Sequence, residues 1–175
     1  MVQKYTMIAR FLHWIMAALL IVQIALGVAA DRTQPDTARS LLDAHVQLGL
    51  TLLALVILRL LWRATHTPPA LPTALAQPHR AAAKVTHWAL YALMVVMPVS
   101  GYLLWMWIGR DLDFIGTVQI PLPDLSDQDE FWRSLAGYTH EFAGYALFAL
   151  IALHIGAASW HEWVRGDRLI RDRMV

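Results

Sequence analysis

Two histidines close an apolar stretch near the C-terminal end of the sequence, "HEFAGYALFALIALH" at residues 140–154. Fourteen residues make almost four helical turns, so His140 and His154 should project from one face of a helix, about 21 Å apart. Imidazole is costly to bury in lipid unless it has a partner. The spacing therefore predicts that something binds to this helix face at two different depths.

The composition indicates a membrane protein. Of the 175 residues, 58% are apolar and 15% are charged, against about 45–50% and about 25% in soluble domains. The chain has no cysteine, which excludes disulfides, thiolate-bound iron–sulfur clusters and the covalent attachment of c-type haem. We expect a single integral-membrane domain over residues 1–175, in contact with the lipid bilayer and without a nucleic-acid partner.

Four apolar segments are each long enough to span a bilayer as a helix. The prediction is an all-α, transmembrane four-helix bundle. The first segment could instead be a secretory signal, but its length of about 20 residues exceeds the 7–15 of a signal core, and cleavage would remove His13. The four segments cover residues of about 11–30, 41–62, 85–108 and 135–160.

The distribution of Lys and Arg predicts the orientation. The N-terminus, the loop between the second and third helices and the C-terminus should share one side, and that side carries a net charge of +7. The other side carries −6, although it includes Arg32, Arg39, Arg110 and Arg133. Because an excess of Lys and Arg marks the cytoplasmic face, both termini should be cytoplasmic.

Counting residues along each helix sorts four histidines by depth. His13 and His154 should lie near the cytoplasmic surface (the inner pair), and His45 and His140 near the outer surface (the outer pair). Facing imidazoles at two depths of a four-helix bundle suit two haems, each with two axial histidines. A single histidine on an apolar helix is usually only a hydrogen-bonded packing residue, but two pairs matched in depth favour ligands.

Small and charged residues share the faces that carry these histidines. Gly27 lies fourteen residues after His13, and Gly49 and Gly144 each follow a candidate ligand by four residues. Glycine lets a porphyrin approach the backbone, although close helix packing also selects small residues. Arg59 lies fourteen residues after His45, at the depth of the inner pair, where its guanidinium could bind a haem propionate. The alternative for Arg59 is that it extends to the inner membrane surface.

The chain resembles the bacterial cytochrome b561 family. The resemblance rests on "RFLHW" (10–14), "DAHVQLG" (43–49), "LRLLWR" (58–63), a proline-rich loop and "THEFAGYALFALIALH" (139–154), and it covers nearly the whole chain. It implies a bacterial inner-membrane protein that holds two haem b groups and exchanges electrons with ubiquinone. Carried over by motif, the haem ligands fall on His13, His45, His140 and His154, the positions that the spacing had already indicated.

Two further histidines are candidates for the quinone site. His161 follows His154 by seven residues and should lie on the cytoplasmic side of the inner pair, near Trp160. Histidine can donate a hydrogen bond to a quinone carbonyl and relay protons, although an interfacial position is the plainer interpretation. His87 could contact quinone or a propionate, or replace an inner ligand. His66 and His79 are expected to be solvated in the proline-rich loop.

The leading prediction for function is a membrane oxidoreductase that moves electrons between a periplasmic donor and ubiquinone. Some members of the family take electrons from superoxide, and others anchor a periplasmic redox protein, so both donors remain open. The outer charge of −6 does not favour an anionic substrate, whereas the acidic "DLSDQDE" (124–130) could dock a basic partner. A histidine-lined divalent-metal transporter is the distant alternative. It would need carboxylates within the span, and only Asp43 and Glu141 approach this position.

Overall fold

Four long helices form the molecule. The computed structural model describes residues 4–70, 76–107, 112–114, 118–120, 123, 125 and 130–175. The helices are α1 (Met7–Asp31), α2 (Pro35–Thr65), α3 (Gln77–Met106) and α4 (Glu130–Ser159). Each is long and apolar enough to cross a membrane, which confirms the predicted transmembrane four-helix architecture.

The helices extend beyond the apolar segments from which they were predicted. The third helix was expected from about residue 85 and begins at Gln77, and the fourth was expected from about 135 and begins at Glu130. Pro35 and Pro78 occupy first-turn positions of α2 and α3, where the missing N–H has no intrahelical partner to lose. The helix ends therefore include polar residues that a hydropathy pattern does not count.

Four short elements of the described chain had no counterpart in the sequence prediction. Strands β1 (Leu112–Phe114) and β2 (Val118–Ile120) form an antiparallel pair between α3 and α4. A five-residue π-helix, η1 (Trp160–Val164), follows α4, and the short helix α5 (Leu169–Arg173) follows η1. These elements are too short to produce a periodic hydropathy pattern. The positions of η1 and α5 determine which side chains meet near the C-terminus.

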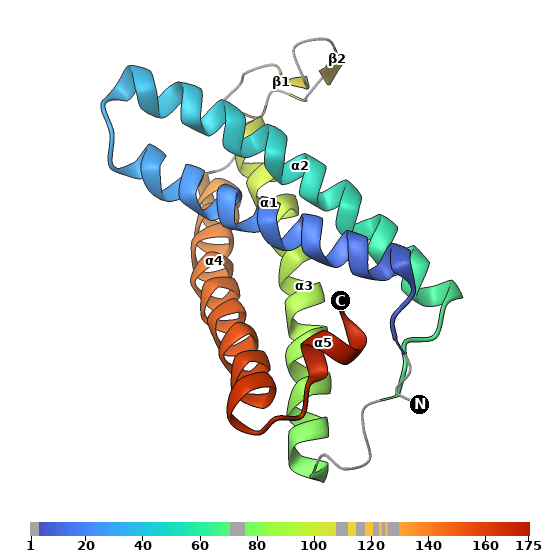
Figure 1. Cartoon of the computed structure of the whole chain (residues 1–175). Helices are drawn as coiled ribbons and strands as arrows, with labels where there is room; N and C mark the ends of the chain where they lie inside the picture. The colour runs from blue at the N-terminus through green and yellow to red at the C-terminus, as the bar shows by residue number, and fades with distance from the viewer. Residues whose placement is uncertain are drawn as a thin grey trace.

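The helices pack as two antiparallel hairpins that cross each other. Helix α1 packs against α2 and α3 against α4, and α2 also contacts α3; Figure 1 shows the α1–α2 hairpin running obliquely across α3 and α4. Few side chains are buried between the helices; they include Leu12, Met16, Leu52, Val56 and Leu147. The bundle therefore brings side chains of different hairpins together at the crossing.

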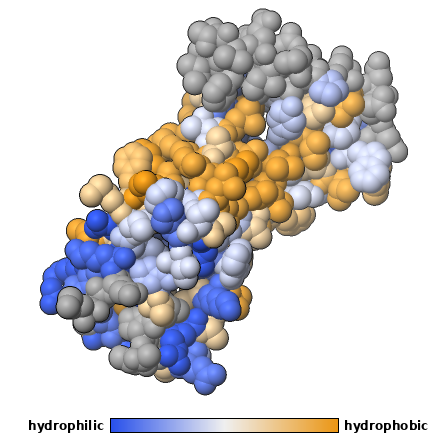
Figure 2. Space-filling view, turned by 90° about the vertical axis from the view of Figure 1, so that its right-hand side faces the viewer, coloured by the Kyte–Doolittle hydropathy of each residue, from blue (hydrophilic) through white to orange (hydrophobic). Residues whose placement is uncertain are grey.

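Large apolar side chains face outward along the spans. Phe142, Tyr145 and Phe148 of α4 are each at least 60% exposed, and Figure 2 shows a broad apolar surface over the middle of the molecule. Hydrophilic residues gather at its lower end in that view. A soluble protein rarely exposes apolar area on this scale, so this surface is the lipid-facing surface of the bundle.

Both ends of the described chain meet at one end of the bundle. The backbone N–H of Tyr5 donates to the Arg173 carbonyl at 3.2 Å, and the indole N–H of Trp14 donates to the Met174 carbonyl at 3.0 Å. Arg173 also donates to the carbonyls of Pro69 and Ala70 in the α2–α3 connection. Helix α5 therefore joins the start of α1 to the loop after α2 beneath the bundle.

Candidate functional site

The outer pair lies where α2 and α4 approach each other. The ring centres of His45 and His140 are 6.1 Å apart, and their ring planes are inclined at 79°. A metal–imidazole bond is about 2 Å long, and a nitrogen lies about 1.1 Å from the centre of a five-membered ring with bonds of about 1.33 Å. Two imidazoles on opposite sides of one metal ion would thus have centres about 6.2 Å apart. The observed separation fits an iron between the rings.

Backbone carbonyls orient both rings of the outer pair. Nδ1–H of His45 donates to the Gln23 carbonyl at 3.1 Å, and Nδ1–H of His140 donates to the Met97 carbonyl at 3.0 Å. Since a carbonyl can only accept, the hydrogen lies on Nδ1, and Nε2 keeps the lone pair that a metal requires. Such hydrogen bonds typically fix metal-binding histidines. The two rings are therefore prepared to bind through Nε2.

Two glycines make room for these rings. A Cβ atom at Gly27 would lie 3.1 Å from Cε1 of His45, and one at Gly101 would lie 2.8 Å from Cε1 of His140. Gly27 was expected at this depth, whereas the role of Gly101 was not predicted. Gly49 and Gly144, expected on the ligand faces, lie against Gln23 and Met97 instead. The packing against glycine holds each imidazole close to a neighbouring helix.

The inner pair has almost the same geometry as the outer pair, and a third histidine also contacts one of its members. The ring centres of His13 on α1 and His154 on α4 are 6.2 Å apart, with planes inclined at 81°. His87 on α3 also contacts His154, with ring centres 5.5 Å apart. The His13–His154 separation matches both the outer pair and the spacing expected for two ligands of one iron. The geometry therefore favours His13 over His87 as the partner of His154.

Arg59 points toward the inner pair. Its Nε–H donates to the Tyr91 hydroxyl at 3.1 Å, with the guanidinium carbon 5.9 Å from the centre of the Tyr91 ring. Its positive charge acts through space on His13, His87 and His154. Within the described part of the chain, Arg59 forms no ion pair with a carboxylate. The guanidinium is therefore available for an acidic group between the helices. Its contact with Tyr91 was not predicted from the sequence.

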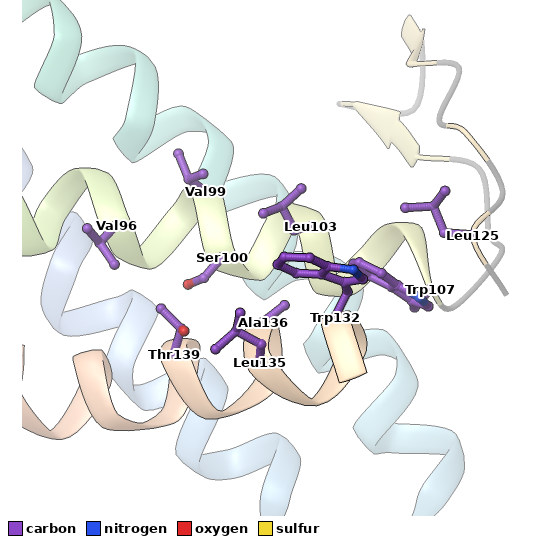
Figure 3. Close-up of a pocket in the computed structure, with 10 residues that line it drawn as sticks. All are labelled: Val96, Val99, Ser100, Leu103, Trp107, Leu125, Trp132, Leu135, Ala136 and Thr139. Carbon is purple, nitrogen blue, oxygen red and sulfur yellow. The ribbon is translucent and has the colours of Figure 1, made fainter. Parts of the chain in front are cut away.

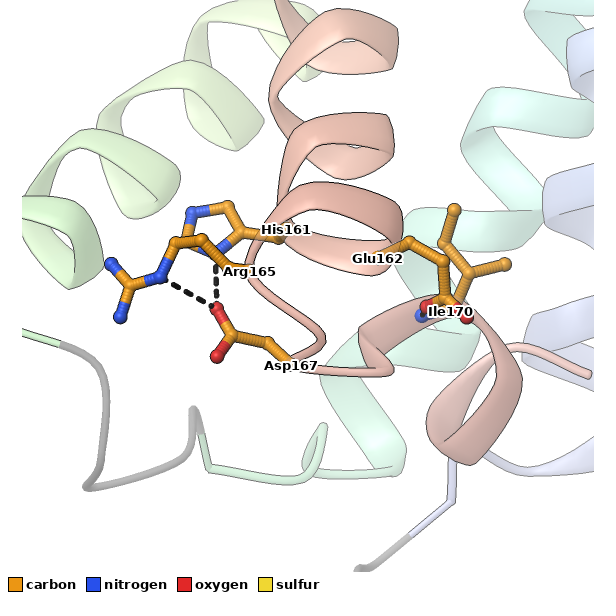
Figure 4. A network of polar contacts seen from close by, with 5 residues as sticks. All are labelled: His161, Glu162, Arg165, Asp167 and Ile170. Atoms are coloured by element: carbon orange, nitrogen blue, oxygen red, sulfur yellow. Dashed lines mark hydrogen bonds and ion pairs between the residues drawn. The ribbon is translucent and has the colours of Figure 1, made fainter.

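His161 belongs to a polar network beneath the inner pair. Its Nδ1 lies 2.6 Å from Oδ2 of Asp167, which also pairs with Nε of Arg165 at 3.3 Å (Figure 4). The His161 ring contacts His79, with ring centres 5.5 Å apart. His79 was expected in the loop but lies in the first turn of α3. His66 ends α2, stacked on Trp62.

A separate cavity of about 630 Å³ lies between α3 and α4. Figure 3 shows Trp107 and Trp132 at one end, and Ser100 and Thr139 supply its hydroxyl groups. Ser100 donates to the Met97 carbonyl at 3.0 Å and lies 3.3 Å from Nδ1 of His140. Among the residues that the structure describes, none that lines the cavity is charged.

The structure describes only some of the charged residues that were predicted to lie on the outer side of the membrane. Arg32 and Arg39 are exposed, and Arg133 pairs with Glu130 at 3.6 Å. Arg110 and most of "DLSDQDE" (124–130) lie outside the described residues. Of the four outer arginines, one is thus already neutralised by a carboxylate of its own helix.

The donor set is suited to haem rather than to a bare metal ion. Among the residues described, no three His, Cys, Asp or Glu side chains form a group that could hold a metal ion. A porphyrin supplies its own nitrogens, so each iron needs only the axial ligands that the two histidine pairs can provide. Both pairs therefore fit this cofactor.

Over nearly its whole length the sequence is similar to one family of known proteins. The family model described as prokaryotic cytochrome b561 matches residues 4–175. Cytochrome b561 homolog 2 of Escherichia coli (strain K12) is 25% identical over 173 residues, which cover 97% of this chain and 90% of that protein. Cytochrome b561 homolog 1 of the same organism is 25% identical over 164 residues, covering 91% and 90%.

Proposed function

Because the chain belongs to the prokaryotic cytochrome b561 family of membrane haem b proteins, we propose that it carries electrons between a periplasmic donor and ubiquinone through two haems. The family and the four spans confirm the predicted electron-transport class and the multi-pass inner-membrane location. The proposal adds that the protein holds two haems, takes electrons from a periplasmic donor and passes them to ubiquinone.

The observation that supports two haems is the matched geometry of the two histidine pairs. His45 with His140 would hold the outer haem and His13 with His154 the inner haem, at centre separations of 6.1 and 6.2 Å. A bound haem supplies an iron that takes up or gives away one electron at a time. The imidazole nitrogens of the two pairs would be the protein groups that bind the iron of each haem.

The charge pattern supports a cytoplasmic location for both termini. The end of the bundle that holds α5 and the start of α1 also holds Arg63, Arg165, Arg171 and Arg173. Lys and Arg near the ends of spans accumulate on the cytoplasmic side. In this orientation the inner pair and His161 lie toward the cytoplasm, and the outer pair lies toward the periplasm.

For the quinone site, the structure offers two candidates on the cytoplasmic side. His161 lies beside Trp160 and Asp167 and next to an aromatic and cationic surface. His87 contacts His154 directly and would compete with a haem for the same space. We therefore propose that His161 contacts the quinone and that His87 contacts a propionate or the edge of the inner haem.

Superoxide is the first donor to test, with a periplasmic redox protein as the alternative. We expect purified protein to show a two-haem b spectrum and to reduce a soluble ubiquinone when superoxide is generated. If outer arginines attract superoxide, this rate should fall several-fold as salt is raised from low to physiological strength. A rate that rises with salt, or no reaction, would favour the protein donor; a protein without haem bands would overturn the whole proposal.

Arg59 should set the potential of the inner haem. A unit charge about 10 Å from iron, at an effective dielectric constant of about 20, contributes about 1.7 kcal/mol, or about 70 mV for one electron. Redox titration of Arg59→Leu should therefore show one haem shifted downward by roughly this amount and the other nearly unchanged. Tyr91→Phe, which keeps the charge, is the matched control; equal shifts at both haems, or none, would contradict the assignment.

A further inference from the structure

The polar network around His161 is built by an unusual end of α4. The helix widens into the π-helix η1, whose last turn is closed by the Arg165 N–H donating to the Trp160 carbonyl at 3.0 Å. A π-helix turn shifts the side chains that follow it relative to the α-helical stripe, and such turns occur frequently at functional sites. His161 and Glu162 consequently point to different sides, as Figure 4 shows.

A sharp reversal after η1 returns Asp167 to His161. Gly166 has φ of +69°, a left-handed conformation that costs glycine little and other residues more. The Asp167 N–H then donates to the His161 carbonyl at 2.9 Å, while the Asp167 carboxylate accepts from Nδ1–H of His161 at 2.6 Å. Two hydrogen bonds thus tie Asp167 to one residue.

The contact between His161 and Asp167 is shielded from solvent. The side chains are 13% and 23% exposed, so their interaction is screened less than a surface pair. A carboxylate that accepts from Nδ1–H fixes the tautomer and the orientation of the ring. Nε2 is left as the atom of His161 that can take up and release a proton.

His79 provides a second imidazole next to this one. It lies in the first turn of α3 and meets the His161 ring edge to face, with ring centres 5.5 Å apart. Its Nδ1 is buried and has no hydrogen-bond partner among the described residues. Burying a nitrogen without a hydrogen-bond partner is unfavourable, so such an atom commonly marks a place that a water or ligand occupies.

We propose that Asp167 is a positioning residue that holds His161 as the proton donor to bound quinone, and that His79 passes replacement protons to His161. This inference rests on the proposed quinone site at His161. The groups facing His161 are Asp167 in the loop after η1, Arg165 through Asp167, and His79 from α3. One carboxylate is thus shared by an imidazole and a guanidinium.

His161 and His79 can take part in the proton supply that reduction of a quinone requires. A quinone takes two electrons and two protons, so that both carbonyl oxygens become hydroxyls. The electrons come from the periplasmic one-electron donor, two donors being oxidised for each quinone. Nε2 of His161 gives a proton to the carbonyl oxygen that it faces, and the opposite carbonyl oxygen takes its proton from water. His79 then restores the proton of His161 from the cytoplasmic side.

The test compares an acceptor that needs protons with one that does not. Full-length protein is reduced, and reoxidation of its haems is followed by stopped-flow absorbance with a short-chain ubiquinone or with ferricyanide. A positioned proton donor contributes about 10²–10⁴-fold to a rate, so Asp167→Asn should slow the ubiquinone reaction on the order of tenfold or more and leave the ferricyanide reaction unchanged.

The matched control is Asp172→Asn, five residues along the same tail. Asp172 pairs only loosely with Arg168, at 3.9 Å, and its replacement should change neither rate. His79→Gln is the second test variant and should reproduce the selective loss with ubiquinone; it decides the outcome if Asp167→Asn fails to retain haem.

The outcomes separate this inference from the proposed function. If His161→Ala slows the ubiquinone reaction but Asp167→Asn and His79→Gln do not, the relay is wrong and the quinone site stands. If Asp167→Asn slows both acceptors equally, its role is structural and the relay is wrong. An unchanged ubiquinone rate in His161→Ala would overturn both the relay and the placement of the quinone site.

Discussion

Replacing His154 by alanine should lower the haem content from about two haems per chain to about one. Loss of one axial nitrogen leaves an inner iron with a single protein ligand, while the outer pair, held by the carbonyls of Gln23 and Met97, keeps both of its own. Haem extraction per mole of protein measures the loss, and a redox titration should show that one of two components has disappeared. His45→Ala and His140→Ala should remove the other component.

His13→Ala and His87→Ala together decide the partner of His154. If the 6.2 Å pair binds the inner iron, His13→Ala should lose the inner haem and His87→Ala should keep both. The reverse result would make His87 the ligand. Two low-spin haems retained in His154→Ala would show that this pairing is wrong.

The positions of the four ligand candidates could be predicted because helical rise converts residue number into depth. Fourteen residues separate His140 from His154, and this spacing places them at the levels where His45 and His13 arrive from other helices. Depth alone does not say which helices are neighbours. The ring of His87 on α3 lies 5.5 Å from that of His154, closer than the 6.2 Å of His13 on α1. Both contacts depend on how the two hairpins cross.

Two parts of the site could not be predicted from periodicity. Asp167 reaches His161 through a π-helix turn and a glycine in a left-handed conformation, and neither feature leaves a repeating pattern in a sequence. His79 looked like a loop residue because polar residues precede the apolar part of the third helix. Pro78 in the first turn of α3 lets the helix begin earlier, which carries His79 to His161.

Gly101 lies within "MPVSGY" (97–102) of the third apolar segment, three residues after Pro98, and the sequence assigns it no role. The structure gives Gly101 a more specific role, since its missing side chain is replaced by the ring of His140. A helical pattern cannot distinguish a glycine that permits close helix packing from one that receives a side chain of another helix. That distinction leads directly to a test of the outer site.

Gly101→Leu should abolish binding of the outer haem while the inner haem remains. A Cβ at this position would lie 2.8 Å from Cε1 of His140, closer than such atoms pack. The ring cannot simply turn away, because Nδ1 donates to the Met97 carbonyl and Nε2 must face the iron. We expect haem content to fall from about two to about one per chain, and the titration component lost in His140→Ala to be lost here too.

Gly156→Leu is the matched control. Gly156 lies on α4. In the described part of the chain, apart from its chain neighbours and the adjoining turns of α4 backbone, no atom lies within 4 Å of the position that its Cβ would take, so the new side chain should extend into lipid. Leucine also favours the helical conformation over glycine, by about 0.8 kcal/mol. This variant should therefore keep both haems and both potentials. If Gly101→Leu behaves like Gly156→Leu, the ring of His140 does not need its place against α3, and the outer haem must be held in a different geometry from the one inferred from His45 and His140.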